Sequence, residues 1–274
     1  MSATSDVQNS ETAPPPAPND ASSAHSTGQS SAKAPKCATL PPLQLDPRWY
    51  NHVRPLMRGD VTTVAELHAK GMGTTLWGRF GRHFLEALYR AMLDDPDFVA
   101  FVFEENRIVR GFIVGSTDGP NMMKRTFRKA FWKLLPHVVK AGYRDPALIR
   151  EALATPRYFA KSATDARARD AAESFFCYIQ EEWRGTRISG LMNKFLFDEL
   201  LFRGFQRVKI TTEADNDGAL RQLDSWGFEC VGDFEFYGKK MTTHLLELHI
   251  CPRVQPVRRH IIKDTEQVQR LGSG

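Results

Sequence analysis

The sequence has few cysteines and no long apolar run. None of its apolar runs approaches the roughly 18 residues that a membrane-spanning helix needs. The first residues have neither a basic start nor an apolar core, so a secretory signal peptide is not expected. The four cysteines, Cys37, Cys177, Cys230 and Cys251, form no CxxC pair. We therefore predict neither a metal site nor a disulfide framework, and the expected location is the reducing cytoplasm.

Large apolar side chains are also scarce at the N-terminus. Residues 1–46 are rich in Ser, Ala, Pro, Thr and Asn, and such a segment buries too little surface to offset its ordering entropy. We predict a disordered arm there, a single domain over residues 47–250, and a polar, basic tail over 251–274. The chain as a whole is 42% hydrophobic, which suffices for one sizeable core.

Positive charge is concentrated in one segment. The net charge is only +5, yet residues 122–170 contain twelve Lys/Arg against four Asp/Glu. Nucleic acid, an anionic membrane surface and the phosphates of a cofactor are the alternatives. No base-reading motif accompanies the charge, so nucleic acid is not expected. Apolar residues at helical spacing predict that this segment packs on its own domain, in preference to a membrane surface or a homodimer face.

Hydrophobic periodicity and turn residues predict alternating helices and strands. A strand is expected at 52–57, where Pro55 indicates either an edge position or a bulge. A helix capped by Asp60 is expected at 61–70, a second helix at 76–93 and a hairpin of strands 97–104 and 108–116. A helical insertion at about 120–170 follows, which Pro136, Pro146 and Pro156 are expected to interrupt. The remainder is expected as strand 174–179, helix 188–202, strand 208–212, a short helix after Asn216, and strands 229–236 and 241–248.

The stretch 173–190 combines a buried strand, a polar corner and the start of a helix. Unpaired amide groups and the positive end of the helix dipole favour an anion at such a corner. The dinucleotide glycine fingerprint is absent, and no Walker-type Lys-Ser/Thr follows. Taken alone, the pattern is more typical of an ordinary strand-to-helix turn.

Two downstream features extend this pattern: a second strand, and Asn216, Ala219 and Gly227-Phe228 in a short helix that follows it. In order and spacing, residues 52–248 resemble the Gcn5-related N-acetyltransferase (GNAT) superfamily. The resemblance implies an α/β (α+β) fold with a mixed, mostly antiparallel sheet, splayed central strands and helices on both faces. The helical insertion then lies between the third and fourth strands. It further implies transfer of acetyl from acetyl-CoA to a small-molecule or peptide amine, directly and in a ternary complex.

The resemblance also implies cofactor-binding positions. The pantetheine arm would pair with the strand at Cys177, Tyr178 and Ile179 and contact Asn216. The pyrophosphate would lie over the amides of Arg184, Gly185, Thr186, Arg187, Ile188 and Ser189. Two of these depart from the family pattern: Arg187 stands where the family usually has its first glycine, and Ser189 stands where the family has glycine or alanine. Ser189 is small enough to have little effect. Arg187 either crowds the phosphates or, turned outward, offers them a cation.

The catalytic assignments are less specific. Glu173 stands where many relatives have a general base, although a solvated strand-end carboxylate explains it equally well. Leu223 occupies the position at which the family often has a tyrosine that acts as general acid. Tyr178 is therefore the candidate general acid here, with Tyr237 as an alternative. Both tyrosines are typical of residues that only pack in a core. A buried core thiol is the expected role of Cys177. Two rival functions stay open: a catalytically silent domain that binds a CoA ester, and a basic interaction protein.

Overall fold

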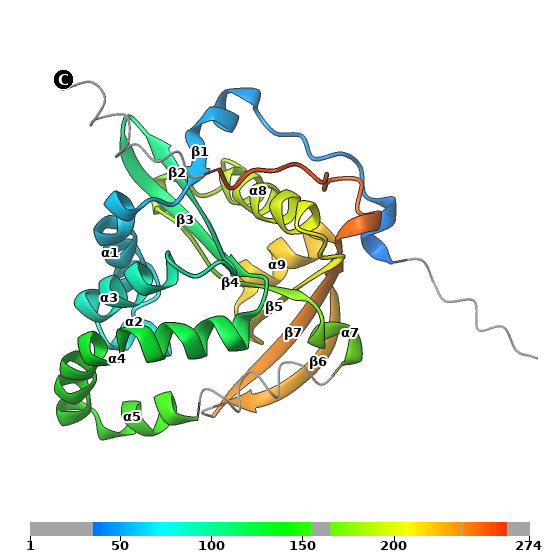
Figure 1. Ribbon diagram of the computed structural model, residues 1–274. Helices are drawn as coiled ribbons and strands as arrows, with labels where there is room; N and C mark the ends of the chain where they lie inside the picture. The colour runs from blue at the N-terminus through cyan, green and yellow to red at the C-terminus, as the bar shows by residue number, and fades with distance from the viewer. Residues whose placement is uncertain (1–34, 155–164, 237, 262–274) are drawn as a thin grey trace, which may run out of the picture. The chain divides into compact units, whose positions relative to one another are not determined.

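The computed structural model describes residues 35–154, 165–236 and 238–261 (Figure 1). The chain divides into two compact units, residues 1–33 and residues 34–274, and all described residues belong to the second unit. Among the helices of the described residues, none combines the length and hydropathy that crossing a membrane requires.

Seven strands form one sheet in the order β1-β2-β3-β4-β5-β7-β6. Their bounds are β1 Val53–Pro55, β2 Phe98–Glu105, β3 Ile108–Ser116, β4 Ala172–Ile179, β5 Arg207–Glu213, β6 Glu229–Phe236 and β7 Lys239–Glu247. Neighbouring strands are antiparallel except β4 and β5, which are parallel. Pro55, which cannot donate to a ladder, lies in the edge strand as predicted. The mixed sheet and the hairpin of β2 and β3 are confirmed.

Strands β4 and β5 pair over only two positions, Ala172 with Val208 and Glu173 with Lys209. The register of β3 and β4 shifts at Gly115, which leaves Phe175 without a partner in β3. A Cβ atom on Gly115 would lie 2.8 Å from the carbonyl oxygen of Glu173, so the bulge requires a glycine there. Beyond Glu173 the two strands separate into a wedge, and the predicted splay is confirmed.

Helices cover both faces of the sheet (Figure 1). One face carries α1 Val61–Gly71, α2 Leu76–Arg79, α3 Arg82–Met92, α4 Gly119–Arg144 and α5 Pro146–Leu153, and the other carries α8 Ile188–Phe202 and α9 Asp217–Trp226. Alternation along β2 divides the core, because Ala100 and Val102 face the first group whereas Phe101 and Phe103 face the second. A short helix, α7 Ala166–Arg169, precedes β4.

Three local predictions need correction. The helix predicted at 76–93 is two helices, because Gly81 has a φ of +86° between α2 and α3. Helix α4 continues through Pro136. Asp60 precedes α1 without a side-chain cap; its carboxylate instead accepts hydrogen bonds from the Arg54 guanidinium (2.6 Å) and the Met57 amide (2.9 Å).

The packed unit extends beyond both predicted domain boundaries. Cys37, expected in the disordered arm, is 1% exposed and lies in the short 3-10 helix Lys36–Thr39, against the backbone of Gly227. At the other end, Cys251 and Val254 are buried in the same core. Packing therefore begins before residue 47 and continues past residue 250. Residues 1–34 of the predicted arm and 262–274 of the tail lie outside the described residues.

Candidate active site

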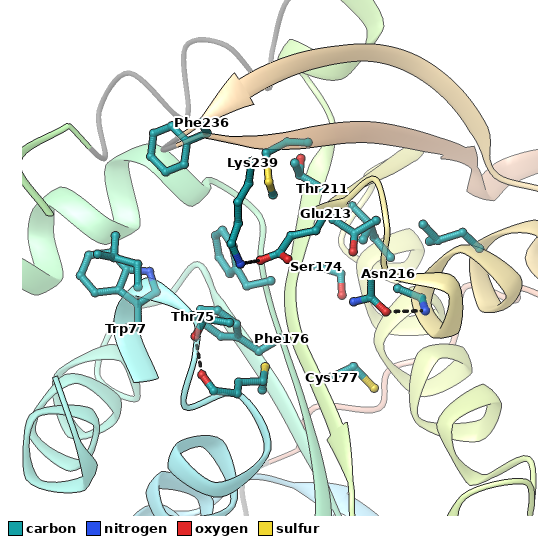
Figure 2. A pocket seen from close by; sticks show the side chains of 18 of the residues that line it. Thr75, Trp77, Ser174, Phe176, Cys177, Thr211, Glu213, Asn216, Phe236 and Lys239 are labelled. Carbon is teal, nitrogen blue, oxygen red and sulfur yellow. Dashed lines mark hydrogen bonds and ion pairs between the residues drawn. The ribbon is translucent and has the colours of Figure 1, made fainter. Parts of the chain in front are cut away.

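A cavity of about 420 Å³ occupies the wedge between β4 and β5 (Figure 2). Residues 174–177 of β4 form one wall and residues 210–213 of β5 form the other. The cavity continues past α9 to the connection between α1 and α2 and to the tip of the β6–β7 hairpin. The unpaired edges of the two central strands therefore line a single cavity.

Cys177 is the one member of the predicted trio on β4 whose side chain lines this cavity. Burial raises the pKa of its thiol to about 12, so the group is a neutral thiol near pH 7. Tyr178 packs in the first core beside Gly71, and Ile179 packs in the second. For these two residues, only the backbone is available to a ligand in the wedge.

The start of α8 presents a row of free donors. Within the described residues, none of the backbone N–H groups of residues 185–190 donates a hydrogen bond, and the first helical bond runs from the Leu191 amide to the Arg187 carbonyl. Gly185 has a φ of +78° and open space around it. Thr186 is exposed, Ile188 is buried and Ser189 is half-buried. An anionic group fits this amide row, which lies at the positive end of the α8 dipole.

Two arginines belong to this region: Arg184 comes just before the amide row, and Arg187 lies within it. Arg184 is exposed, lies 3.6 Å from the Glu181 carboxylate and has its guanidinium carbon 5.9 Å from the centre of the Tyr178 ring. Arg187, with a left-handed φ of 66°, donates a hydrogen bond to the Gln44 carbonyl (3.0 Å). Its side chain lines a separate small cavity and not the wedge. The Arg187 side chain therefore lies outside the wedge, against the segment that contains Gln44.

Glu173 lies at the closed end of the wedge, away from the cavity lining. Its side chain is 2% exposed, and its carboxylate is 3.6 Å from the Lys209 ammonium group, which is also buried. Burial raises the pKa of the carboxyl group, and the charge of Lys209 opposes this shift. The structure thus places the predicted base in a buried ion pair.

The tyrosine position of the family is filled here by an apolar residue. Leu223 of α9 lines the cavity and is buried, so it brings no hydroxyl group to the wedge. Asn216 lines the cavity too. Its side-chain oxygen caps α9 by accepting from the Ala219 amide (3.1 Å), which leaves its NH2 group to face the wedge (Figure 2). Tyr237 lies outside the described residues.

The residues at the far end of the cavity were not predicted from the sequence. Met72, Thr75 and Trp77 come from the α1–α2 connection, and Phe236 and Lys239 come from the β6–β7 hairpin (Figure 2). The Lys239 ammonium group pairs with Glu213 of β5 at 2.6 Å. The resemblance placed the first two helices beside the acceptor, but no local pattern could show which hairpin tip lies opposite them.

In the part of the chain that the structure describes, no group of three or more His, Cys, Asp or Glu side chains is arranged to hold a metal ion. The polar groups of the wedge are amides, hydroxyls, a thiol and ion-paired side chains. They suit hydrogen bonding to a ligand rather than coordination.

No family model and no curated protein matches this sequence. Solved structures do match. An N-acetyltransferase from Staphylococcus aureus Mu50 is 17% identical over 71% of this chain and 99% of its own, with a TM-score of 0.50. Ard1 from Thermoplasma volcanium (13% identity, 71% and 95% covered, TM-score 0.45) and the spermidine/spermine N-acetyltransferase SpeG from Vibrio cholerae (15%, 72% and 94%, 0.43) are also similar. The sheet order, the bulge in β4, the wedge and the likeness to the Staphylococcus structure together give the conclusion that this chain has the GNAT fold of the Gcn5-related N-acetyltransferases.

Proposed function

We propose that this protein is an acetyl-CoA-dependent N-acetyltransferase that acetylates an amine in a ternary complex. The observation that carries the proposal is the open wedge between β4 and β5, and the free amide row at the start of α8, the helix that follows β4 in the chain, supports it. A strand edge without a partner can bind an extended amide-bearing chain by backbone hydrogen bonds. A helix start with free N–H groups binds phosphate.

The residues of this chain divide the binding task. The amides of residues 185–190 and the Arg184 guanidinium would hold the pyrophosphate. The free edge of β4 at residues 177–179 and the NH2 group of Asn216 would hold the pantetheine arm. When bound, acetyl-CoA supplies an activated acetyl group on a thioester.

Direct transfer is favoured over a covalent enzyme intermediate. Cys177 is the cysteine on the cavity wall, and its raised pKa keeps it a thiol, which is a poor nucleophile. The acceptor amine itself then forms the bond to the acetyl carbon. This requires that the amine first lose a proton.

We propose Glu213, in place of Glu173, as the acceptor of that proton. Glu213 lies on the cavity wall, whereas Glu173 lies behind it in its pair with Lys209. Tyr178 is also outside the lining, and Leu223 provides no hydroxyl group. The leaving thiolate therefore has no tyrosine donor among the described cavity residues. This feature favours the rival function, a silent CoA-binding domain, and makes a turnover measurement decisive.

The walls of the acceptor end indicate the class of amine. Met72, Trp77, Phe236 and Met241 give it an apolar surface. The two carboxylates that line the described cavity are both ion-paired, Glu151 with Arg79 and Glu213 with Lys239. A polycation would find no uncompensated negative charge among these residues. We therefore propose an acceptor amine carried on an apolar or aromatic body.

The cofactor site is tested with the Arg184→Glu variant. Charge repulsion should weaken acetyl-CoA binding, measured by calorimetry, by about tenfold or more. Arg150→Glu, an equal charge change at an exposed position of α5, should leave the affinity unchanged. Unchanged affinity in Arg184→Glu would count against the site.

Thiol release with phenethylamine and spermidine then tests activity. Faster release with phenethylamine supports the proposed acceptor class, and no release with any amine supports the silent domain.

A further inference from the structure

Helix α4 has two apolar faces, and the fold uses one of them. Met122, Met123, Ala130 and Leu134 are buried in the first core, beside α3. Side chains on the other faces of the helix are largely exposed: Phe131 by 50%, Trp132 by 80%, Val139 by 62% and Tyr143 by 91%. Trp132, Val139 and Tyr143 recur at spacings of seven and four residues, so they form one ridge that points away from the domain.

Positive charge surrounds this ridge. The 26 residues of α4 contain seven Lys or Arg and no Asp or Glu. Arg125 pairs with Asp95 (2.7 Å) and Lys129 pairs with Asp94 (2.7 Å). In the described part of the chain, the remaining five form no ion pair: Lys124, Arg128, Lys133, Lys140 and Arg144. The exposed side of α4 is therefore both aromatic and strongly cationic.

A polar groove runs beside the ridge, between α3 and α4. It encloses about 530 Å³, and its charged and titratable lining is Arg58, His83, Glu86, Arg90, Asp94, Lys129, Lys133 and His137. Four Lys or Arg thus face two carboxylates, so the groove has an excess of positive charge. Lys133 and His137 belong to α4 itself, which places the groove on the flank of the ridge.

We propose that this side of α4 docks on an anionic phospholipid bilayer. Trp and Tyr side chains favour the boundary between headgroups and acyl chains, where the ring is apolar and its polar tip stays wet. Lys and Arg beside them attract the negative surface, and an excess of cations in the α3–α4 groove suits a headgroup phosphate. The sequence alone favoured packing on the protein's own domain, and the structure shows that packing occupies only the opposite face of the helix.

Charge complementarity separates this occupant from a second copy of the chain. Two such surfaces brought face to face would oppose five cations without carboxylate partners against five more. An anionic bilayer instead neutralises them, and binding should weaken as salt rises. The proposal does not depend on the acetyltransferase proposal, because the ridge residues Trp132, Val139 and Tyr143 and the cations around them do not line the wedge cavity.

The full-length protein is sedimented with vesicles of phosphatidylcholine alone or of equal parts phosphatidylcholine and phosphatidylserine. We expect binding to the anionic vesicles that is at least about tenfold stronger and that salt reverses. The Trp132→Ala/Tyr143→Ala and Arg128→Glu/Lys133→Glu variants should each lower it by about tenfold. Ile108→Ala and Lys70→Glu, which change an exposed apolar side chain and a cation outside α4, should leave it unchanged.

Circular dichroism spectra and thermal unfolding curves that match those of the native protein establish that each variant is folded. Equal binding to both kinds of vesicle, or native binding by the α4 variants, would overturn the proposal. So would a native dimer, measured by sedimentation equilibrium without vesicles, that Trp132→Ala dissociates. Preferential binding of single-stranded oligonucleotide over anionic vesicles would overturn it as well.

Discussion

His68 is a polar side chain placed inside the apolar core. It lies in α1, is 0% exposed, and packs against the rings of Phe112 and Phe176. Its Nδ1 atom lies 2.8 Å from the Tyr89 hydroxyl group, whereas Nε2 has no hydrogen-bond partner among the residues that the structure describes. Burial lowers the pKa of the imidazole from 6.5 to about 3. The folded protein therefore holds this ring neutral over a range in which the unfolded chain protonates it.

This difference makes stability depend on pH. Below pH 6.5 the unfolded state binds the proton and the folded state does not, so the free energy of unfolding falls as the pH decreases towards about 3. The slope from one such group approaches about 1.4 kcal/mol per pH unit. Replacing His68 with Gln should flatten the dependence between pH 6.5 and 5, measured by urea unfolding. His249→Gln, at an exposed site, should retain the native slope; an unchanged slope in His68→Gln would contradict the argument.

Individual residues differ in how far sequence could predict them. Gly115, Gly204 and Gly227 follow from local rules, since a bulge and two left-handed helix ends each favour glycine. The orientation of Arg187 does not, because its partner is the carbonyl of Gln44, 143 residues away. The sequence supported two roles for Glu173 equally, a general base and a solvated carboxylate. Its ion pair with Lys209 on β5 became known only from the fold.

Elements with strong local signals were predicted closely. Helix α8 has the predicted bounds of 188 and 202, and β6 has those of 229 and 236. The break at Gly81 was missed, because apolar residues on both sides of it continue one helical period. The acceptor end of the cavity depends on this break, which places Trp77 and Leu76 on the cavity wall and Phe84 in the core. Non-local contacts, and not local propensity, decide that geometry.

The close contact between Gly78 of α2 and the α1–α2 connection, residues 72–75, gives a prediction for the acceptor site. Alanine normally stabilises a helix relative to glycine by about 1 kcal/mol. At Gly78 the sign should reverse, because an added Cβ would lie 2.1 Å from the Met72 carbonyl oxygen and 2.8 Å from the Gly73 Cα. The Gly78→Ala variant should displace the residues 72–77 that line the cavity. We expect a higher KM for the acceptor with little change in acetyl-CoA affinity.

Gly59→Ala is the matched control, since nothing lies within 4 Å of its added Cβ. It should leave both constants unchanged. An acceptor KM in Gly78→Ala equal to that of the native enzyme would show that the α1–α2 connection does not bind the acceptor. An equal loss of affinity for both substrates would indicate general destabilisation instead.

In the folded molecule as a whole, two segments far apart in the sequence pack around α8: residues 37–45, before β1, and residues 251–260, after β7. This helix buries four polar residues, Asn193, Lys194, Asp198 and Glu199, which a surface helix would expose. The C-terminal segment provides partners for three of them: the Arg259 guanidinium pairs with Asp198 (2.9 Å), the His260 amide donates to Glu199 (2.8 Å), and the Arg253 carbonyl accepts from Lys194 (2.9 Å). Buried charges are tolerated only with such partners. The sequence predicted only a polar, basic tail for these residues, and it could not show that they lie beside α8.

The N-terminal segment completes the enclosure of α8 and α9. The Arg253 guanidinium donates to the carbonyls of Pro41 (2.8 Å) and Ser225 (2.6 Å), which joins this segment to the C-terminal one. Cys37 and the partly buried Leu40, Leu43 and Leu45 pack against the second core. The ordered unit therefore includes residues that composition alone assigned to a disordered arm.

Two truncations distinguish these domain boundaries. Deletion of residues 1–33 stops at the unit boundary and should leave the melting temperature unchanged. Deletion of residues 1–46 also removes Cys37 and the leucines that pack beside it, and burial of one such side chain contributes about 1.5–3 kcal/mol. The longer deletion should therefore lower the melting temperature by about 5 °C or more at this chain length. Equal melting temperatures for the two truncated proteins, measured by calorimetry at one concentration, would return the boundary to residue 46 and remove the N-terminal segment from the stability of α8.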